Sequence, residues 1–426
     1  MTDEPTARAR VSRRGFVGAA AGLVAAAGTG LGTGAQAASP QAPSGQAEPF
    51  WGAHQGGIVT PAQLHTYFAA FDLVATKREQ VVDLLARWTD AAAQMSAGEP
   101  VAAAGYDAEG PAADSGDIAG LGPARLTVTF GFGAGLFVKN GVDRYGLASR
   151  RPGPLVDMPI FPGDQLIAAK TGGDVSVQAC ADDPQVAFHA VRELARLAYE
   201  VAEIRWVQSG FVAGYGAGQT PRNLMGFKDG TNNPPLDDAD VMNAVVWVGD
   251  EGPAWMRGGS YVVFRRSRVA LEHWDRMKVA FQEQTIGRQK DSGAPLGKTL
   301  EHDQPDLDAA DQDGNPVMPE NSHVRLAMAQ TNDGARVLRR SYSYSDGANI
   351  IAERWPPWRQ AMEFDAGLLF VCYQRDPRTG FIKIFERMAK FDMMNQFVTN
   401  TGSALFACPG GVAKGAFIGQ SLFDAI

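Results

Sequence analysis

The chain has 426 residues, of which 45% are hydrophobic and 20% charged, so it can bury one large or two medium-sized cores and is not disordered overall. Its 39 Lys and Arg against 47 Asp and Glu leave a net charge of -8, which disfavours nucleic-acid binding. Three widely separated cysteines exclude a disulfide framework, a four-cysteine metal site and a CxxCH cofactor attachment.

The first 37 residues are expected to be an export signal. Residues 12–16 (SRRGF) precede an apolar stretch dominated by Gly and Ala, which ends at residues 35–37 (AQA). This order resembles a twin-arginine signal with an A-x-A cleavage site, whereas a membrane anchor would be followed by stop-transfer charges. Twin-arginine substrates cross the membrane folded, which favours a protein with an inserted cofactor. We expect removal of residues 1–37, a flexible linker over 38–48, and a mature protein that is secreted or held in the periplasm or cell envelope.

The next part of the chain predicts a β-α-β-β-α-β order. Apolar, aromatic and β-branched patterns predict strands at 65–74, 125–132, 175–180 and 206–212. A capping box at 76–79 begins a helix that runs to about Met95, and residues 182–184 (DDP) begin a second helix. The apolar face of the second helix is expected to comprise Val186, Val191, Leu194, Leu197, Val201 and Ile204. This order is that of a ferredoxin-like unit.

The second half predicts another unit of the same kind. Strands are expected at 244–248, 260–264, 336–344 and 368–373, and helices at 269–284 and 379–397. The last helix has as core candidates Phe381, Ile384, Phe385, Met388 and Phe391. Residues 301–320 are expected to form an acidic loop. The sequence thus predicts an α+β fold of two packed ferredoxin-like domains, residues 49–225 and 226–426.

Three patterns that resemble ligand-binding loops are incomplete. Residues 293–299 (GAPLGKT) miss a phosphate loop by one position, and residues 214–218 (GYGAG) lack the spacing of a dinucleotide fingerprint. Acidic residues near 311–320 would place Ala309 at the first ligand position of a calcium loop. Neither a nucleotide nor calcium is therefore expected.

Residues suited to chemistry gather in three segments of the second half. Residues 226–234 (GFKDGTNNP) place Asp229 between glycines, either as a functional carboxylate or in a tight turn. His323 enters an apolar stretch from a loop, as a ligand directed into a pocket would, whereas His189 lies within a helix, where a packed or surface histidine is the default. Arg339 faces the apolar side of a predicted strand and requires an anionic or other partner.

Several segments are similar, in the same order, to those of one enzyme family. They are PRNLMGFKDGT, GGSYVVFRRSR, EQTIGRQKDSGAPLG, SHVRLA, VLRRSYSY and FERMAKFDMMNQFVTNTGSALFACPGG. GFKDGTNNP resembles the GxxDG motif of the dye-decolourising haem peroxidases. The twin-arginine leader and residues 52–58 (GAHQGGI) resemble the exported branch of that family, which includes proteins described as deferrochelatases. The resemblance covers the mature chain nearly end to end and implies paired ferredoxin-like domains with haem in the C-terminal half.

The resemblance implies one haem b per chain and a set of residues that hold it. His323 is expected to ligate the iron, and Asp392 to accept a hydrogen bond from its imidazole, which makes the ligand more basic. Arg288 matches a position expected to pair with a haem propionate. Gly230, the last residue of the GxxDG motif, and Thr231, which follows it, are expected at the cofactor.

The resemblance also implies roles in catalysis for Asp229 and Arg339. Asp229 is the expected distal acid–base residue, which takes a proton from hydrogen peroxide and returns it to the outer oxygen. Arg339 stabilises the developing negative charge and keeps Asp229 ionised, which leads to a ferryl intermediate. Bulky dyes would be oxidised through surface aromatic residues, for which the candidates, each with packing as the alternative, are Tyr342, Tyr344, Tyr373 and Trp255.

We therefore expect an exported haem b peroxidase that uses hydrogen peroxide to oxidise dyes and other aromatic reductants. One alternative is a deferrochelatase that removes iron and leaves the porphyrin intact, and the other is a haem-binding protein without turnover. Asp229 and Arg339 argue against the binding protein, which would not require them, but not against the deferrochelatase. The expected partners are small molecules, hydrogen peroxide and aromatic reductants, and no nucleic acid is expected. No membrane span is expected after the signal is removed. A homo-oligomer is compatible with the sequence.

Overall fold

The structure, a computed structural model, describes residues 45–101, 114–214, 218–352 and 360–424. The expected signal and residues 38–44 of the expected linker lie outside the described residues. Residues 45–48 are bound to the fold: the backbone N–H of Arg125 donates to the carbonyl of Gln46 at 2.9 Å, and its Nε donates to Glu48 at 2.8 Å. Within these ranges, no helix combines the length and apolar character needed to cross a membrane.

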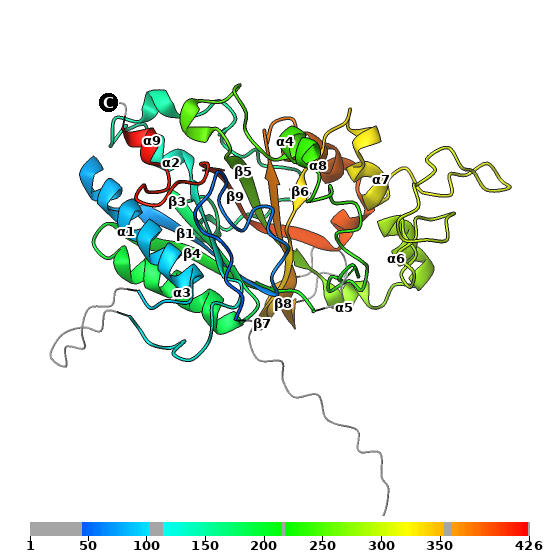
Figure 1. Cartoon of the computed structure of the whole chain (residues 1–426). Coiled ribbons are helices and arrows are strands. Elements are labelled where there is room, and N and C mark those ends of the chain that lie inside the picture. Colours follow the sequence, from blue (N-terminus) through cyan, green and yellow to red (C-terminus); the bar gives the residue numbers. More distant parts are fainter. Residues whose placement is uncertain (1–44, 102–113, 215–217, 353–359, 425–426) are drawn as a thin grey trace, which may run out of the picture. The chain divides into compact units, whose positions relative to one another are not determined.

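The strands of the described chain belong to one sheet in the order β5-β9-β2-β3-β1-β4-β7-β8-β6. Their bounds are β1 His65–Leu73, β2 Thr127–Phe132, β3 Val175–Ala181, β4 Ala202–Phe211, β5 Ser260–Val269, β6 Leu338–Arg339, β7 Tyr342–Ala352, β8 Gln360–Gln374 and β9 Val398–Cys408. Strand β5 also pairs with β8, so the sheet closes on itself, and all strand pairs are antiparallel (Figure 1). Closure covers strand edges that would otherwise be free to pair with another chain.

The helices complete two β-α-β-β-α-β units. Their bounds are α1 Arg78–Ser96, α2 Ala134–Phe137, α3 Pro184–Leu197, α4 Ala239–Val245, α5 Leu271–Trp274, α6 Val279–Ile286, α7 His323–Ala327, α8 Phe381–Phe391 and α9 Gln420–Phe423. In the first unit the sheet order is β4-β1-β3-β2, and in the second β9-β5-β8-β7, which is the same arrangement. The predicted α+β class with paired ferredoxin-like units is confirmed. The division at residues 225 and 226 stays a prediction.

The N-cap predicted for α3 is confirmed, and that predicted for α1 is one residue too early. The carboxylate of Asp183 caps α3 by accepting from the N–H groups of Gln185 at 2.8 Å and Val186 at 3.1 Å, as the sequence predicts. Helix α1 begins later than predicted, with Lys77 as N-cap, and the Gln80 side chain accepts from the Lys77 N–H at 3.2 Å.

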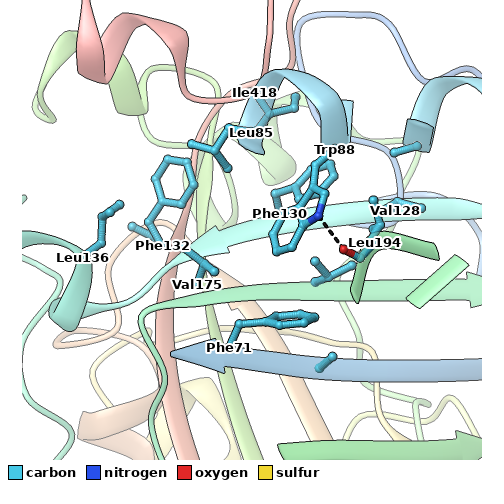
Figure 2. Close-up of a cluster of buried hydrophobic side chains, with 14 of the residues drawn as sticks. Phe71, Leu85, Trp88, Val128, Phe130, Phe132, Leu136, Val175, Leu194 and Ile418 are labelled. Atoms are coloured by element: carbon cyan, nitrogen blue, oxygen red, sulfur yellow. Dashed lines mark hydrogen bonds between the residues drawn. The ribbon is translucent and has the colours of Figure 1, made fainter. Parts of the chain in front are cut away.

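Trp88 joins the two helices and the sheet of the first unit (Figure 2). Its side chain is fully buried, and its ring centroid lies 5.2 Å from that of Phe71 and 5.9 Å from that of Phe130. The indole Nε1 donates to the carbonyl of Leu194 in α3 at 2.7 Å. One side chain on α1 therefore contacts α3, β1 and β2, and Figure 1 shows α1 and α3 side by side.

Replacing Trp88 with Ala is expected to lower the free energy of unfolding by about 3–5 kcal/mol, because it opens a cavity and removes the indole hydrogen bond to the Leu194 carbonyl. Urea unfolding followed by far-UV circular dichroism measures the change. Tyr199→Ala is the control, since that side chain is 80% exposed and its loss should cost less than about 0.5 kcal/mol. Equal losses in both variants would contradict this account of the core.

Two predicted elements of the second half are wrong. The expected strand over 244–248 is instead the last two residues of α4 and the segment that follows the helix. Asp238 caps α4 by accepting from the N–H of Val241 at 3.0 Å. The expected single helix over 269–284 is divided, because β5 continues to Val269 and the chain then forms α5 and α6. The Gln282 side chain donates to the Trp274 carbonyl at 2.9 Å and holds these two short helices together.

Other boundaries also differ from the predictions. The expected strand over 336–344 is divided into β6 and β7, which follow one another along the same side of β8. The expected helix over 379–397 ends at Phe391, and β9, which was not predicted, follows it. Two expected core residues, Ile204 and Phe391, are instead exposed, at 52% and 60%.

Candidate active site

Asp229 and Arg339 form a direct ion pair although 110 residues separate them. The Nη1 of Arg339 donates to Oδ1 of Asp229 at 2.9 Å, and Nδ2 of Asn223 donates to the other carboxylate oxygen at 3.2 Å. The Arg339 side chain remains 29% exposed and the Asp229 side chain 21% exposed. The pair is therefore organised but still accessible to a small ligand.

The GxxDG loop is tied to β6 by one amide side chain. Asn233 donates from Nδ2 to the Arg339 carbonyl at 2.8 Å and accepts from the Arg339 N–H at 3.1 Å. Gly226 and Gly230 have φ of 85° and 122°, values that favour glycine. The Asp229 N–H donates to the Pro221 carbonyl at 2.8 Å. The loop backbone and Asn233 together fix the position of Asp229 relative to Arg339.

His323 is the first residue of α7, and its ring orientation is set by Asp392. The Nδ1 of His323 lies 2.7 Å from Oδ2 of Asp392, whose other oxygen accepts from the Met394 N–H at 2.8 Å. The Asp392 carboxylate is almost fully buried, whereas the His323 side chain is 30% exposed. Because an ionised carboxylate only accepts hydrogen bonds, the neutral imidazole carries its proton on Nδ1 and keeps a lone pair on Nε2.

The electrostatics of His323 link it to the Asp229–Arg339 pair. Burial by itself lowers the pKa of His323, but the charge and hydrogen bond of Asp392 outweigh that effect, and the net pKa is raised. Asp229 raises this pKa further and Arg339 lowers it. Charges from the two pairs therefore act on the same imidazole, and the structure brings the four predicted residues into one region.

Arg288 lies near this region but is held by backbone carbonyls. It is buried, and its Nη1 donates to the carbonyls of Gly293 at 2.6 Å and Glu301 at 2.8 Å. Burial is the main cause that lowers the pKa of Arg288, and the positive charge of Arg339 acts in the same direction. The two guanidinium groups are thus close enough to repel one another, which favours an anion near both.

Glu301 connects the GxxDG loop to the acidic segment, and sequence reasoning did not identify it. Its Oε1 accepts from Thr231 Oγ1 at 3.0 Å, and its Oε2 accepts from Lys228. Burial alone would raise the pKa of Glu301, but hydrogen bonds from Lys228, Thr220 and Thr231 outweigh it and lower the pKa to about 2. Thr231, predicted at the cofactor, therefore has an ionised protein partner.

Sequence reasoning also missed Asn223 and Asn233, since an amide in a turn has no distinctive pattern.

The prediction that four aromatic residues lie at the surface and carry electrons to bulky dyes is wrong about their exposure. All four are buried, with exposures of 1% for Tyr342, 0% for Tyr344, 0% for Tyr373 and 5% for Trp255.

Comparison with known proteins gives a consistent result. The model of the N-terminal part of the Dyp-type peroxidases matches residues 55–212, and that of the C-terminal part matches residues 220–413. A dye-decolorizing peroxidase of Thermobifida fusca (strain YX) is 39% identical over the whole of both chains. A deferrochelatase of Yersinia pestis bv. Antiqua (strain Nepal516) is 37% identical over 89% of this chain and 86% of its own.

Solved structures agree with these matches. DtpA of Streptomyces lividans, in an X-ray generated oxyferrous complex, superimposes with a TM-score of 0.81 at 40% identity, over 91% of this chain and all of its own. A DyP-type peroxidase of Cellulomonas bogoriensis gives a TM-score of 0.78 at 38% identity, over 90% and 99% of the two chains. By its two family models, its relatives and its fold, the chain belongs to the Dyp-type peroxidases, a haem-dependent family of oxidoreductases.

Proposed function

We propose that the protein is a haem b peroxidase in which Asp229 is the acid–base residue and Arg339 stabilises charge as peroxide is reduced. The observation that carries this proposal is the Asp229–Arg339 ion pair, which acts electrostatically on a histidine that a buried carboxylate orients. Dyes and other aromatic reductants are the proposed electron donors.

The residues present fit a haem iron. His323 has a lone pair on Nε2, a partly exposed ring and a carboxylate partner on Nδ1, which is the usual setting of a metal-ligating histidine. Arg288 is the proposed partner of a propionate, because the positive charges of Arg288 and Arg339 lie close together. When bound, haem supplies the redox-active iron centre for peroxide reduction.

The side chains divide the proton and charge handling between them. Oδ1 of Asp229 is occupied by Arg339, so Oδ2, which has only the longer contact with Asn223, is the proposed proton-accepting atom. The same atom returns the proton to the departing oxygen. Arg339 keeps Asp229 ionised and stabilises negative charge, since a guanidinium does not release its proton in this pH range. Asp392 retains the Nδ1 proton of His323 and so makes Nε2 a stronger donor.

Turnover of a dye by the haem-loaded mature protein tests the function. Peroxide-dependent dye loss, with iron still bound to the porphyrin at the end, is the expected result. Absence of dye oxidation would contradict the proposal, and iron release with intact protoporphyrin would instead favour the activity for which the Yersinia relative is named. Extraction of the porphyrin after the reaction distinguishes the two.

Export through the twin-arginine route is a further part of the proposal, supported by Arg13 and Arg14 before the apolar stretch. Changing both arginines to Lys is expected to leave the precursor in the cytoplasm, while the unchanged chain is cleaved so that it begins near Ala38. Cell fractionation and N-terminal sequencing are the measurements. Changing Arg8 and Arg10 to Lys is the matched control, and unimpaired export of the Arg13 and Arg14 variant would contradict folded export.

A further inference from the structure

A second group of chemically active side chains lies in the first ferredoxin-like unit. His189 and Glu193 are four residues apart on α3 and so share one face of the helix. Asp114 reaches the same place from the loop before β2. One ligand atom from each of the three side chains lies within 4.8 Å of the others. None of these residues belongs to the proposed peroxidase site.

His189 has a buried nitrogen without a hydrogen-bond partner. The side chain is fully buried, and Nε2 has no hydrogen bond. Oδ2 of Asp114 lies 3.6 Å from Nε2, beyond hydrogen-bonding distance. Nδ1 lies 2.7 Å from Oδ1 of Asp117, so in the neutral ring the proton is on Nδ1 and Nε2 holds a lone pair. A buried unpaired acceptor is costly, and a cation would satisfy it.

The two carboxylates are held in place by bonds that leave lone pairs free. Oδ2 of Asp114 accepts from the Val101 N–H at 2.8 Å, and its Oδ1 accepts from the Gly116 N–H at 2.7 Å. Oε1 of Glu193 accepts from the Ser115 N–H at 3.0 Å, and its Oε2 accepts from Arg196. Each carboxylate oxygen has capacity for a second partner.

We propose that Asp114, His189 and Glu193 bind a first-row transition-metal dication of the Zn²⁺ type. One imidazole nitrogen and two carboxylates are a donor set that such ions accept, with water in the remaining position. Asp117 is the outer carboxylate that orients the ring, the arrangement found around metal-ligating histidines. The ion would cross-link the segment 114–117 to α3. The competing arrangement is a protonated His189 between Asp117 and Asp114, which would exclude metal.

Zn²⁺ titration of the tag-free mature protein by calorimetry tests the proposal. The protein is haem-loaded and chelator-treated, so that His323 is occupied, and a His323→Ala background repeats the test independently of the peroxidase site. One equivalent of Zn²⁺ is expected to bind, with affinity reduced about 10–100-fold by Asp117→Asn and at least as much by Asp114→Asn. His65→Gln is the control, since the charges of Asp182 and Asp183 also act on that histidine.

Two results would contradict the metal site. Absence of saturable Zn²⁺ binding, or equal affinity in all variants, would show that the cluster is an ion-pair network only. Zn²⁺ should also raise the Tm of the unchanged protein but not that of His189→Gln. If His189→Gln does not fold, the same Tm comparison is made with Asp114→Asn, in which Zn²⁺ should likewise fail to raise the Tm. That variant is less disruptive because the Asp114 side chain is 14% exposed.

Discussion

Arg339→Leu is expected to slow the reaction of the haem-loaded protein with hydrogen peroxide by about 10²–10³-fold, and Asp229→Asn by about 10²–10⁴-fold. Asn keeps the shape of the side chain but cannot take the peroxide proton. Leu removes the cation that stabilises charge as the O–O bond breaks. Stopped-flow absorbance of the haem band, at equal haem occupancy, is the measurement.

The direct contact between the two side chains makes their effects interdependent. Each single variant also removes the ion-pair partner of the other residue, so the double variant should lose less than the product of the two single losses. Asp237→Asn and Arg336→Leu are matched controls, since both residues are exposed and neither belongs to the site. If both site variants react at the unchanged rate, neither residue is catalytic, and haem binding or iron removal would become the better explanation.

The first ferredoxin-like unit was predictable because its signals are local. Asp183 before Pro184 marks a helix start, and the strands follow simple patterns. The elements of the second unit were harder to predict from the sequence. Residues 245–248 are a buried apolar run that begins at the last residue of α4, and a short run of this kind looks the same in a strand or at a buried helix end.

Strand β9 was missed because polar residues lie within a buried strand. Thr401 accepts a hydrogen bond from Arg266 at 2.9 Å, and Asn400 accepts one from Ser267 at 2.8 Å, so β5 satisfies these groups inside the closed sheet. The sequence alone does not show which partner strand lies opposite. The polar residues at 399–401 therefore interrupt the apolar pattern by which a buried strand would be recognised.

The active-site residues were predicted by resemblance, but their contacts depend on the fold. The pair His323 and Asp392 spans 69 residues, and no spacing rule relates them. Asn233 acts by bonding the backbone of Arg339, so its role exists only once β6 lies beside the loop. Side chains that position others are thus less visible in a sequence than those that react.

His323→Ala is expected to abolish most haem binding, or to leave haem without the spectrum of a histidine-ligated iron. No other residue has both a free imidazole nitrogen and a place beside Asp229 and Arg339 among the described contacts. Asp392→Asn should be milder, with haem affinity reduced about 10–100-fold, because the ligand remains but loses its anionic partner. Titration of apoprotein with haemin, followed by its visible spectrum, is the measurement.

The control for this prediction is His302→Ala, whose side chain is 68% exposed and lies 3.9 Å from Glu301. Its haem binding should be unchanged. His323→Ala leaves the Asp392 carboxylate buried without its imidazole, so folding must be checked by circular dichroism before haem loss is ascribed to the ligand. A folded His323→Ala protein with full haem loading and an unchanged spectrum would show that another residue ligates the iron. The Asp229–Arg339 pair would then need a different partner across the site.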